Sequence, residues 1–397
     1  MTLTQSSTVR FIHTSDWQLG MHRGFLATAD DSAPGGAAEA QARFDAARLD
    51  AVKALGELAS AEDAEFIVVA GDVFDYNSLS PRTEGRIWEV LRQLPVPVYL
   101  LPGNHDPLVA DSIFHKTDEL DGVYYFSSTD PVVVRPGVEL IGAPLKAIQA
   151  NRDLVAEAIA AVEPLETIRI VVGHGQTESR ESVPRPDTID IANIERKIES
   201  GAIDYVAMGD THSTQQLSDT GAVWFSGSPE VTAFNDLDTA AGGEHDSGNA
   251  LIVDITKSGP KQADVSVRKE HVGTWRFETF IATLHERSDV DHFISRLEAY
   301  ENKERTVVKY GLQGSLSLEE HRVLQENLNR LRPVFAALYL RDRTTDIDIT
   351  PTEEDIRSAN LSGFVHDAMS ELVERMTYDE TAKDAASLLY RLAKKGA

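Results

Sequence analysis

Five apolar runs in this chain end in polar side chains that can bind a cation. The runs stop at "SDWQ", "GDVFD", "GNHD", "GHG" and "GDTH", and they supply Asp16, Gln18, Asp72, Asn104, His105, His174, Asp210 and His212. Carboxylate, amide and imidazole donors in this number suit two divalent metal ions. Two cations about 3.5 to 4 Å apart neutralise phosphoryl charge, generate a nucleophile from water and stabilise a leaving oxygen. The residues therefore predict the splitting of a phosphate ester.

Each of these motifs is weak when it is taken alone. A "GD" after a strand is usually a turn or a helix cap, and a "GHG" histidine is more often a hydrogen-bonded loop residue than a ligand. The pair Asn104 and His105 is more specific, because two such side chains at a strand end have few packing reasons. The prediction depends on the ordered set of five motifs.

The elements that must position these groups alternate along the first two thirds of the chain. Runs such as "AEFIVVAGD" and "IRIVVGHG" are rich in β-branched and aliphatic residues, and amphipathic stretches such as "QARFDAARLDAVKALGELA" lie between them. This order predicts an α/β architecture with buried sheets. Ligands bind at the carboxyl ends of strands in such sheets, so the five motifs are expected to converge there. The insert "ATADDSAPGGAAEA", residues 27–40, is predicted to be a surface loop.

The pattern changes after residue 260. Residues 265–350 give strand, helix, strand, helix, strand, and Ser317 with Glu320 fits a capping box. Beyond Pro351 the tail is predicted to form two amphipathic helices. We therefore expect a main domain over 1–260, a small α+β domain over 265–350 and a helical tail over 351–397.

Composition narrows the functional classes. The chain has 397 residues and no cysteine, which excludes disulfides, thiolate zinc sites and cysteine catalysis. The opening "MTLTQSSTVR" is not a signal peptide and no apolar run reaches the length of a membrane span, so a cytoplasmic protein without a membrane anchor is expected. The net charge of −26 repels nucleic acid unless basic groups or bound cations are concentrated locally. The excess of acidic residues has two interpretations: it keeps the protein soluble, or part of it holds metal ions.

The ordered motifs, followed by "FSGSPE" and "NALIVD", resemble the calcineurin-like metallophosphoesterases and, within them, the SbcD-type DNA-repair exonucleases. The resemblance implies a four-layer α/β/β/α sandwich, a small α+β capping domain and C-terminal helices that bind an SMC-type ATPase, SbcC. It implies cleavage of DNA as an exonuclease and endonuclease. A homodimer through helices near "SPRTEGRIWEVLRQL" and "DPLVADSIF" is also implied.

The resemblance also implies roles for the site residues. One metal ion would be held by Asp16, Gln18, Asp72 and His212, and the other by Asp72, Asn104, His174 and Asp210, with Asp72 as the bridge. His105 would protonate or stabilise the leaving oxygen, and Asp106 would orient His105. The family has histidine where this chain has Gln18 and Asp210. This donor set is richer in oxygen, which favours Mn(II), with Mg(II) or Fe(II) as alternatives, over Zn(II).

Two further hypotheses stay open at the level of sequence. One is a binding subunit that keeps the fold and the partner but has a degenerate site. The other is a phosphoesterase that acts on small substrates. Retention of His105, which is not a ligand in the family pattern, favours the enzyme, and the additional domain and tail favour a large substrate.

Overall fold

The computed structural model describes residues 6–28, 36–177, 185–235, 243–350, 363–376 and 378–395. The chain divides into two compact units: residues 1–23 with 41–276, and residues 24–40 with 277–397. The first unit extends past residue 260, where the sequence placed a boundary. The reason is that residues 263–271 form a strand that pairs with residues 249–257 in the main sheet.

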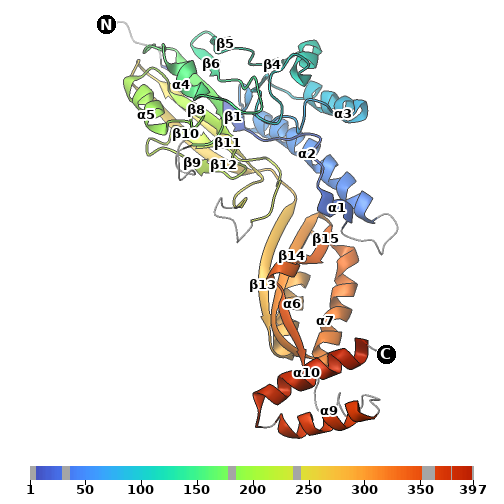
Figure 1. The fold of residues 1–397 in the computed structure, drawn as a ribbon. Helices are drawn as coiled ribbons and strands as arrows, with labels where there is room; N and C mark the ends of the chain where they lie inside the picture. Colours follow the sequence, from blue (N-terminus) through green and yellow to red (C-terminus); the bar gives the residue numbers. More distant parts are fainter. Residues whose placement is uncertain are drawn as a thin grey trace. The chain divides into compact units, whose positions relative to one another are not determined.

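The first unit contains two six-stranded sheets (Figure 1). In the first sheet β1 pairs with β2 in parallel and with β11 in antiparallel fashion, so the sheet is mixed. Its strands, in spatial order, are β12 (Ala263–His271), β11 (Asn249–Lys257), β1 (Ser7–Thr14), β2 (Ile67–Val69), β3 (Val98–Leu100) and β4 (Val123–Tyr125). The second sheet has the order β5 (Val132–Arg135), β6 (Val138–Gly142), β7 (Ile168–His174), β8 (Tyr205–Gly209), β10 (Val223–Phe225) and β9 (Gln215–Gln216).

Three hydrophobic clusters hold the layers of this unit together. Side chains from α2 (Gly36–Ala61) and α3 (Pro81–Arg92) pack on one face of the first sheet. Phe11 and Phe66 from the first sheet pack with Ile170 and Tyr205 from the second, so the two sheets lie face to face. The outer face of the second sheet is covered by α4 (Leu154–Ile159) and α5 (Ile191–Ser200). A turn of 3-10 helix, η1 (Ile113–Glu119), follows β3. The predicted α/β class is confirmed.

The predicted loop over residues 27–40 is corrected in part. Helix α1 spans Gly24–Thr28, and α2 begins at Gly36, so residues 36–40 are helical. The run Gly36–Ala40 contains three alanines, which have the highest helix propensity, and this favours the start of α2 over a loop. Residues 29–35 lie outside the described residues.

A buried histidine joins the two sheets. His13 on β1 has no exposed surface, and its Nδ1 lies 3.0 Å from the Tyr205 hydroxyl while its Nε2 lies 3.2 Å from the Met208 carbonyl oxygen. Burial lowers the pKa of His13 to about 3, so the folded protein keeps this ring neutral.

We expect His13 to make the protein less stable in acid. The unfolded chain takes up a proton on this ring below its ordinary pKa of about 6.5, and the folded chain does so only near pH 3. The free energy of unfolding of the wild type, relative to His13→Gln, should therefore fall by up to about 1.4 kcal/mol per pH unit below pH 6.5. Urea unfolding of both proteins at pH 7, 6 and 5 measures this difference, and a difference that does not change with pH would contradict it.

The second unit contains a four-stranded sheet with two helices on one face. Two strands, β15 and β16, both pair in parallel with the long strand β14. Ser317 caps α7 and forms the predicted capping box with Glu320. Leu324 and Leu328 of α7 pack on the sheet beside α6 side chains such as Phe293. The elements are β13 (Arg276–Leu284), α6 (Arg287–Glu298), η2 (Lys303–Arg305), β14 (Thr306–Ser317), α7 (Leu318–Leu331), η3 (Arg332–Val334), β15 (Ala337–Leu340), η4 (Asp342–Thr344) and β16 (Asp346–Thr350).

Two helices follow near the end of the chain, α9 (Phe364–Arg375) and α10 (Glu380–Lys395). They pack on each other through Met369, Val373, Ala386 and Tyr390, with Leu318 of α7 beside them. The start of the predicted helical tail, residues 351–362, lies outside the described residues. Among the helices that the structure describes, none has the length and apolarity needed to span a membrane.

Candidate metal centre

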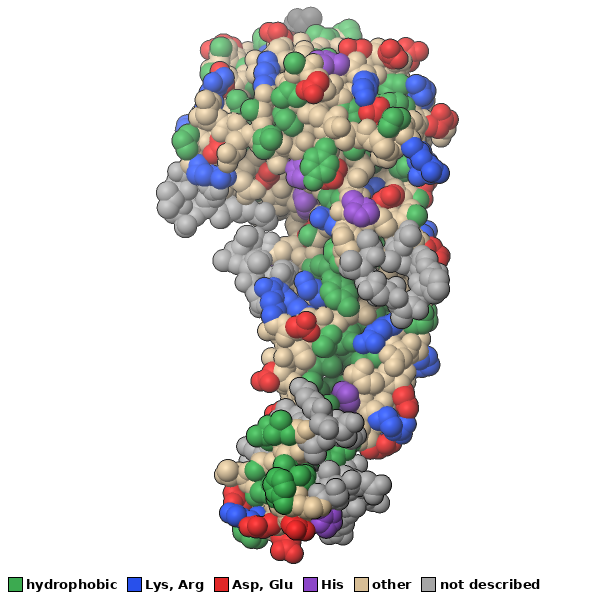
Figure 2. All heavy atoms as spheres, turned by 45° about the vertical axis from the view of Figure 1, so that its right-hand side comes forward, with side chains coloured by type: hydrophobic (Ala, Val, Ile, Leu, Met, Phe, Trp, Pro, Cys, Tyr) green, Lys and Arg blue, Asp and Glu red, His purple; other side chains and the backbone are tan. Residues whose placement is uncertain are grey.

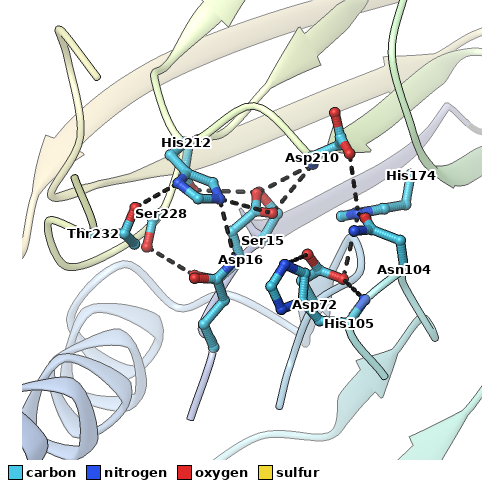
Figure 3. Close-up of polar contacts among 12 residues, drawn as sticks. Ser15, Asp16, Asp72, Asn104, His105, His174, Asp210, His212, Ser228 and Thr232 are labelled. Carbon is cyan, nitrogen blue, oxygen red and sulfur yellow. Dashed lines mark hydrogen bonds and ion pairs between the residues drawn. The ribbon is translucent and has the colours of Figure 1, made fainter. Parts of the chain in front are cut away.

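All five predicted motifs meet at one edge of the first unit. β1, β2 and β3 are parallel neighbours in the first sheet, and β7 and β8 are parallel neighbours in the second. The loops that follow these strands carry the candidate ligands, and His174 is itself the last residue of β7. Because the carboxyl ends of parallel strands share an edge, residues far apart in sequence become neighbours (Figure 3).

One group of ligand candidates surrounds His174. The ligand atoms of Asp16, Asp72 and His174 lie within 4.8 Å of one another, and all three residues are buried. His174 Nε2 lies 3.4 Å from Asp72 Oδ1, 3.7 Å from Asp210 Oδ1 and 2.7 Å from Asn104 Oδ1. The structure thus brings Asp72, Asn104 and Asp210 around His174, and it places Asp16, which was assigned to the other cation, in the same group.

A hydrogen bond on the other ring nitrogen fixes the orientation of His174. Its Nδ1 lies 2.9 Å from the Ala70 carbonyl oxygen, which can only accept, so Nδ1 carries the proton of that bond. This bond turns Nε2 toward the carboxylates. Metal-binding histidines are usually oriented in this way by a hydrogen bond on the other ring nitrogen.

A second group surrounds His212. Its Nε2 lies 3.8 Å from Asp16 Oδ1 and 3.2 Å from Gln18 Nε2. Its Nδ1 faces away from them, at 2.5 Å from Thr232 Oγ1 and 3.5 Å from Glu244 Oε2. Thr232 Oγ1 in turn donates to Glu244 Oε2. Thr232 and Glu244 therefore orient this imidazole, and neither is named by the five motifs.

Four of the predicted ligands have backbones in the left-handed region. The φ angles are 52° at Asp16, 42° at Gln18, 51° at Asp72 and 99° at Asp210, and only Asp63 joins them among the non-glycine residues that the structure describes. Such angles are uncommon for residues with a side chain, and they tend to gather at functional sites. Backbone bonds hold them in place: Asp16 N donates to Gly71 O, and Gln18 N donates to Asp72 O.

Two glycines make room for the ligands. A Cβ on Gly71 would lie 2.1 Å from His174 Nδ1, and a Cβ on Gly103 would lie 2.1 Å from Asp72 Oδ1. Any larger residue at either position would displace a ligand candidate. The glycines in "GDVFD" and "GNHD" are thus explained by the close approach of two strand ends.

The carboxylates at this site carry more negative charge than the side chains around them can neutralise. Burial raises the pKa of Asp16 to about 6. Burial alone would lower the pKa of His174, but the carboxylates of Asp72, Asp16 and Asp210 raise it to about 9. Carboxylates crowded in this way favour any cation that enters, because the attraction between charges is strong where water is excluded.

An unpaired acceptor at the same place also fits a cation. Gln18 is buried, and its Oε1 has no hydrogen-bond partner within the described part of the chain. A buried polar atom without a partner is costly, and a metal ion beside His212 and Asp16 would remove that cost. The donors of the two groups are three carboxylates, two amides and two imidazoles, a set that suits divalent metal ions.

The structure corrects the expected partner of His105. His105 Nδ1 lies 3.6 Å from Asp75 Oδ1 and 3.2 Å from the Asp75 carbonyl oxygen, and the hydrogen bond to Asp75 raises the pKa of His105 to about 9. The His105 backbone N–H donates to Asp72 Oδ1 at 3.0 Å, and the ring Nε2 lies 4.0 Å from Asp72 Oδ2, so the ring stands beside the cluster. Asp106 instead accepts from the backbone N–H groups of Phe74 and Gly103. Asp106 therefore supports two loops, and Asp75 is the carboxylate beside the histidine.

Sequence reasoning also missed two groups that fix the loops. Gln176 Nε2 donates to Asp210 Oδ2, and Arg48 is buried and donates to the carbonyl oxygens of Asp16, Trp17 and Val231. Asp75 was visible within "GDVFD", but the others had no motif to reveal them. They come from helix α2 and from loops, and only the fold places them at the site.

This fold and this buried group of aspartate and histidine side chains define a metal-dependent phosphoesterase. The model of the calcineurin-like phosphoesterase family matches residues 9–246, which is more than half of the chain. The protein belongs to that family.

Comparisons with individual proteins give only partial or distant matches. A stretch of 74 residues is 38% identical to the DNA double-strand break repair protein Mre11 of Archaeoglobus fulgidus, and it covers 18% of this chain and 17% of that protein. Among solved structures, a dimetal phosphatase from Danio rerio has 9% identity and a TM-score of 0.35, with 65% of this chain and 98% of that chain covered. A purple acid phosphatase from yellow lupin (Lupinus luteus) seeds has 13% identity and a TM-score of 0.35, with 67% and 52% covered. Likeness at this level carries no conclusion, so the assignment rests on the family match.

Proposed function

We propose that this protein is a metal-dependent nuclease that hydrolyses the phosphodiester bonds of DNA. The observation that carries the proposal is the position of His105, a histidine outside the ligand groups whose backbone contacts Asp72 and whose ring contacts Asp75. A protonated group next to a cation-binding cluster is what a phosphoester leaving group needs. The choice of DNA is supported by the partial similarity to a DNA double-strand break repair protein and by the second unit, which a small substrate does not require.

We assign the metal ligands according to the two groups of side chains around His212 and His174. Asp16, Gln18, Asp72 and His212 would hold one divalent cation, and Asp72, Asn104, His174 and Asp210 the other, with Mn(II) as the first candidate. Two such cations neutralise the phosphate, lower the pKa of a water and stabilise the leaving oxygen. His105 donates its proton to the leaving oxygen, and Asp75 orients the ring for that transfer. Thr232 and Glu244 keep His212 Nε2 facing the centre.

The test is cleavage of defined DNA by the metal-stripped protein after Mn(II) is added back. Single- and double-stranded oligonucleotides labelled at either end, together with a small chromogenic phosphomonoester, are incubated at matched concentrations. We expect Mn(II)-dependent shortening of DNA and slow turnover of the small ester. Rapid turnover of the small ester with intact DNA would favour the small-substrate alternative. Metal binding without any hydrolysis would favour a degenerate binding subunit.

A partner at the C-terminal helices is part of the proposal. Phe364 and Tyr378 are 79% and 75% exposed, and Leu388 and Leu392 of α10 are 52% and 58% exposed. Figure 2 shows hydrophobic side chains gathered on the surface of these helices. Exposed apolar side chains on amphipathic helices suit the coiled coil of an SMC-type ATPase. The double variant Leu388→Ser, Leu392→Ser should no longer co-purify with such an ATPase and should still cleave short DNA, and this result would support the partner.

The homodimer expected through residues 80–94 and 106–114 stays a prediction that light scattering can check.

The unusual ligands Gln18 and Asp210 lead to a prediction about metal choice. A family-like site with histidine at both positions would be softer, so Gln18→His with Asp210→His should shift the preferred metal from Mn(II) toward Zn(II) or Fe(II). Asp210→Ala should lose one of the two cations and slow cleavage by about a hundredfold or more, as the loss of a charge-stabilising group does. Metal analysis and rates measured across the three metals test both statements. Unchanged metal content and rate in Asp210→Ala would remove Asp210 from the ligand set.

A further inference from the structure

An exposed aromatic side chain stands at the edge of the metal centre. Tyr76 follows the loop that carries Asp72 and Asp75, and it is 61% exposed. Its ring centroid lies 6.2 Å from that of His105, with the two planes at 41°. The proposed chemistry at His105 and the metal centre does not use this ring. A large exposed aromatic ring this close to a reacting centre is suited to stack on another flat ring.

A cation lies near the same edge. Arg23 precedes α1, its backbone N–H donates to Gln41 Oε1, and its Nε is buried without a hydrogen-bond partner in the part of the chain that is described. Burial lowers the pKa of Arg23, and the nearby carboxylates of Glu244 and Asp75 oppose that effect. This guanidinium is therefore partly desolvated and has unused donor capacity.

The neighbours of Arg23 locate it relative to the two ligand groups. Asp75 contacts His105 on one side of the centre, and Glu244 contacts His212 on the other. Because both carboxylates act to raise the pKa of Arg23, its guanidinium also adds positive potential for an anion that binds at the centre. Arginine binds phosphate oxygens with two parallel N–H bonds, which fixes orientation as well as charge.

We propose that Tyr76 and Arg23 form a nucleotide subsite beside the metal centre, in which the Tyr76 ring stacks on a base and Arg23 binds a neighbouring phosphate. The subsite rests on the proposed DNA hydrolysis and specifies its substrate. A base inside a duplex already has stacked neighbours on both faces, so it cannot also cover the Tyr76 ring. The subsite therefore selects a nucleotide whose base is unpaired, as in a single strand or a frayed end.

Binding and cleavage are measured separately to test this. Two single-stranded oligonucleotides of equal length are used, one with normal bases and one with tetrahydrofuran abasic residues throughout, so that both carry the same phosphate charge. Binding is followed by fluorescence anisotropy with Ca(II) in place of Mn(II), and cleavage is then followed with Mn(II). Stacking of a base on an aromatic side chain is worth about 1–3 kcal/mol, so the wild type should prefer the base-bearing strand by about tenfold or more in Kd.

The variants assign the two contacts. Tyr76→Leu should bind both strands equally, and Tyr76→Phe should keep the preference. Arg23→Gln should weaken the binding of both strands by a similar factor, since it removes a phosphate contact. Tyr124→Leu is the matched control, because Tyr124 on β4 is also a half-exposed tyrosine that stacks on another ring, that of Tyr99. It should leave the preference unchanged.

The outcomes separate this subsite from the proposed function. Equal binding of both strands by the wild type, or a preference that survives in Tyr76→Leu, overturns the subsite even if Mn(II)-dependent cleavage occurs. A base preference that depends on Tyr76 without any cleavage of DNA supports the subsite and overturns the nuclease.

Discussion

Replacement of Asp72 by alanine is expected to remove both cations and to abolish DNA cleavage. Asp72 is 2% exposed, and its Oδ1 lies between the His105 backbone N–H at 3.0 Å and His174 Nε2 at 3.4 Å. It is the one predicted ligand shared by both sets, so its loss leaves each cation with an incomplete group of donors. We expect the rate to fall by at least about a thousandfold, the upper range for removal of one preorganised charge-stabilising group.

Metal content and thermal unfolding give readouts that do not depend on activity. A cation that binds only the folded state raises Tm, so added Mn(II) should stabilise the wild type and leave Asp72→Ala unaffected. Asp254→Ala is the control, because Asp254 is a partly exposed carboxylate paired with Arg10 on the first sheet. It should keep both the Mn(II)-induced shift and the rate. Two cations retained in Asp72→Ala would disprove the bridging role.

The sequence predicted the positions of the site residues better than their contacts. Each of the five motifs follows an apolar run that became a buried strand, and the polarity of parallel strands then brings their ends together. This is why the amino-acid sequence alone was enough to group Asp16, Asp72 and His174, which are far apart in the chain. The positive φ angles of Asp16, Gln18, Asp72 and Asp210 were not predicted, because only a few per cent of non-glycine residues adopt them, even though aspartate is enriched among those.

The remaining contacts depend on tertiary structure. Thr232 and Glu244, which lie between β10 and β11 in the chain, contact His212, and no spacing rule relates them to "GDTH". The edge of the main sheet was also misplaced, because β12 has only exposed and half-buried residues and lacks the apolar run that marks strands such as β1 and β11. The resemblance to the family implied that Asp106 orients His105. Adjacent residues at a strand end point in different directions, and Asp75, thirty positions earlier, is the one that faces the ring.

His105→Ala is expected to keep both cations and to slow cleavage by about a hundredfold or more, the loss typical of a missing general acid. The imidazole stands outside both ligand groups, with its Nε2 4.0 Å from Asp72 Oδ2, so its removal deletes a proton donor and leaves the donor atoms in place. Rates, metal content and the Mn(II)-induced change in Tm are measured on the same preparations. Loss of metal in this variant would contradict the role.

The two neighbouring aspartates then distinguish orientation from support. Asp75→Asn should reduce the rate, by less than His105→Ala does, because it weakens the contact that holds the ring without removing the ring itself. Asp106→Asn should lower the free energy of unfolding by about 1–3 kcal/mol, because an amide nitrogen would face one of two backbone N–H groups that the carboxylate now accepts. If Asp106→Asn slowed cleavage as much as His105→Ala with unchanged stability and metal content, Asp106 would act in the chemistry, and the assignment of Asp75 would be wrong.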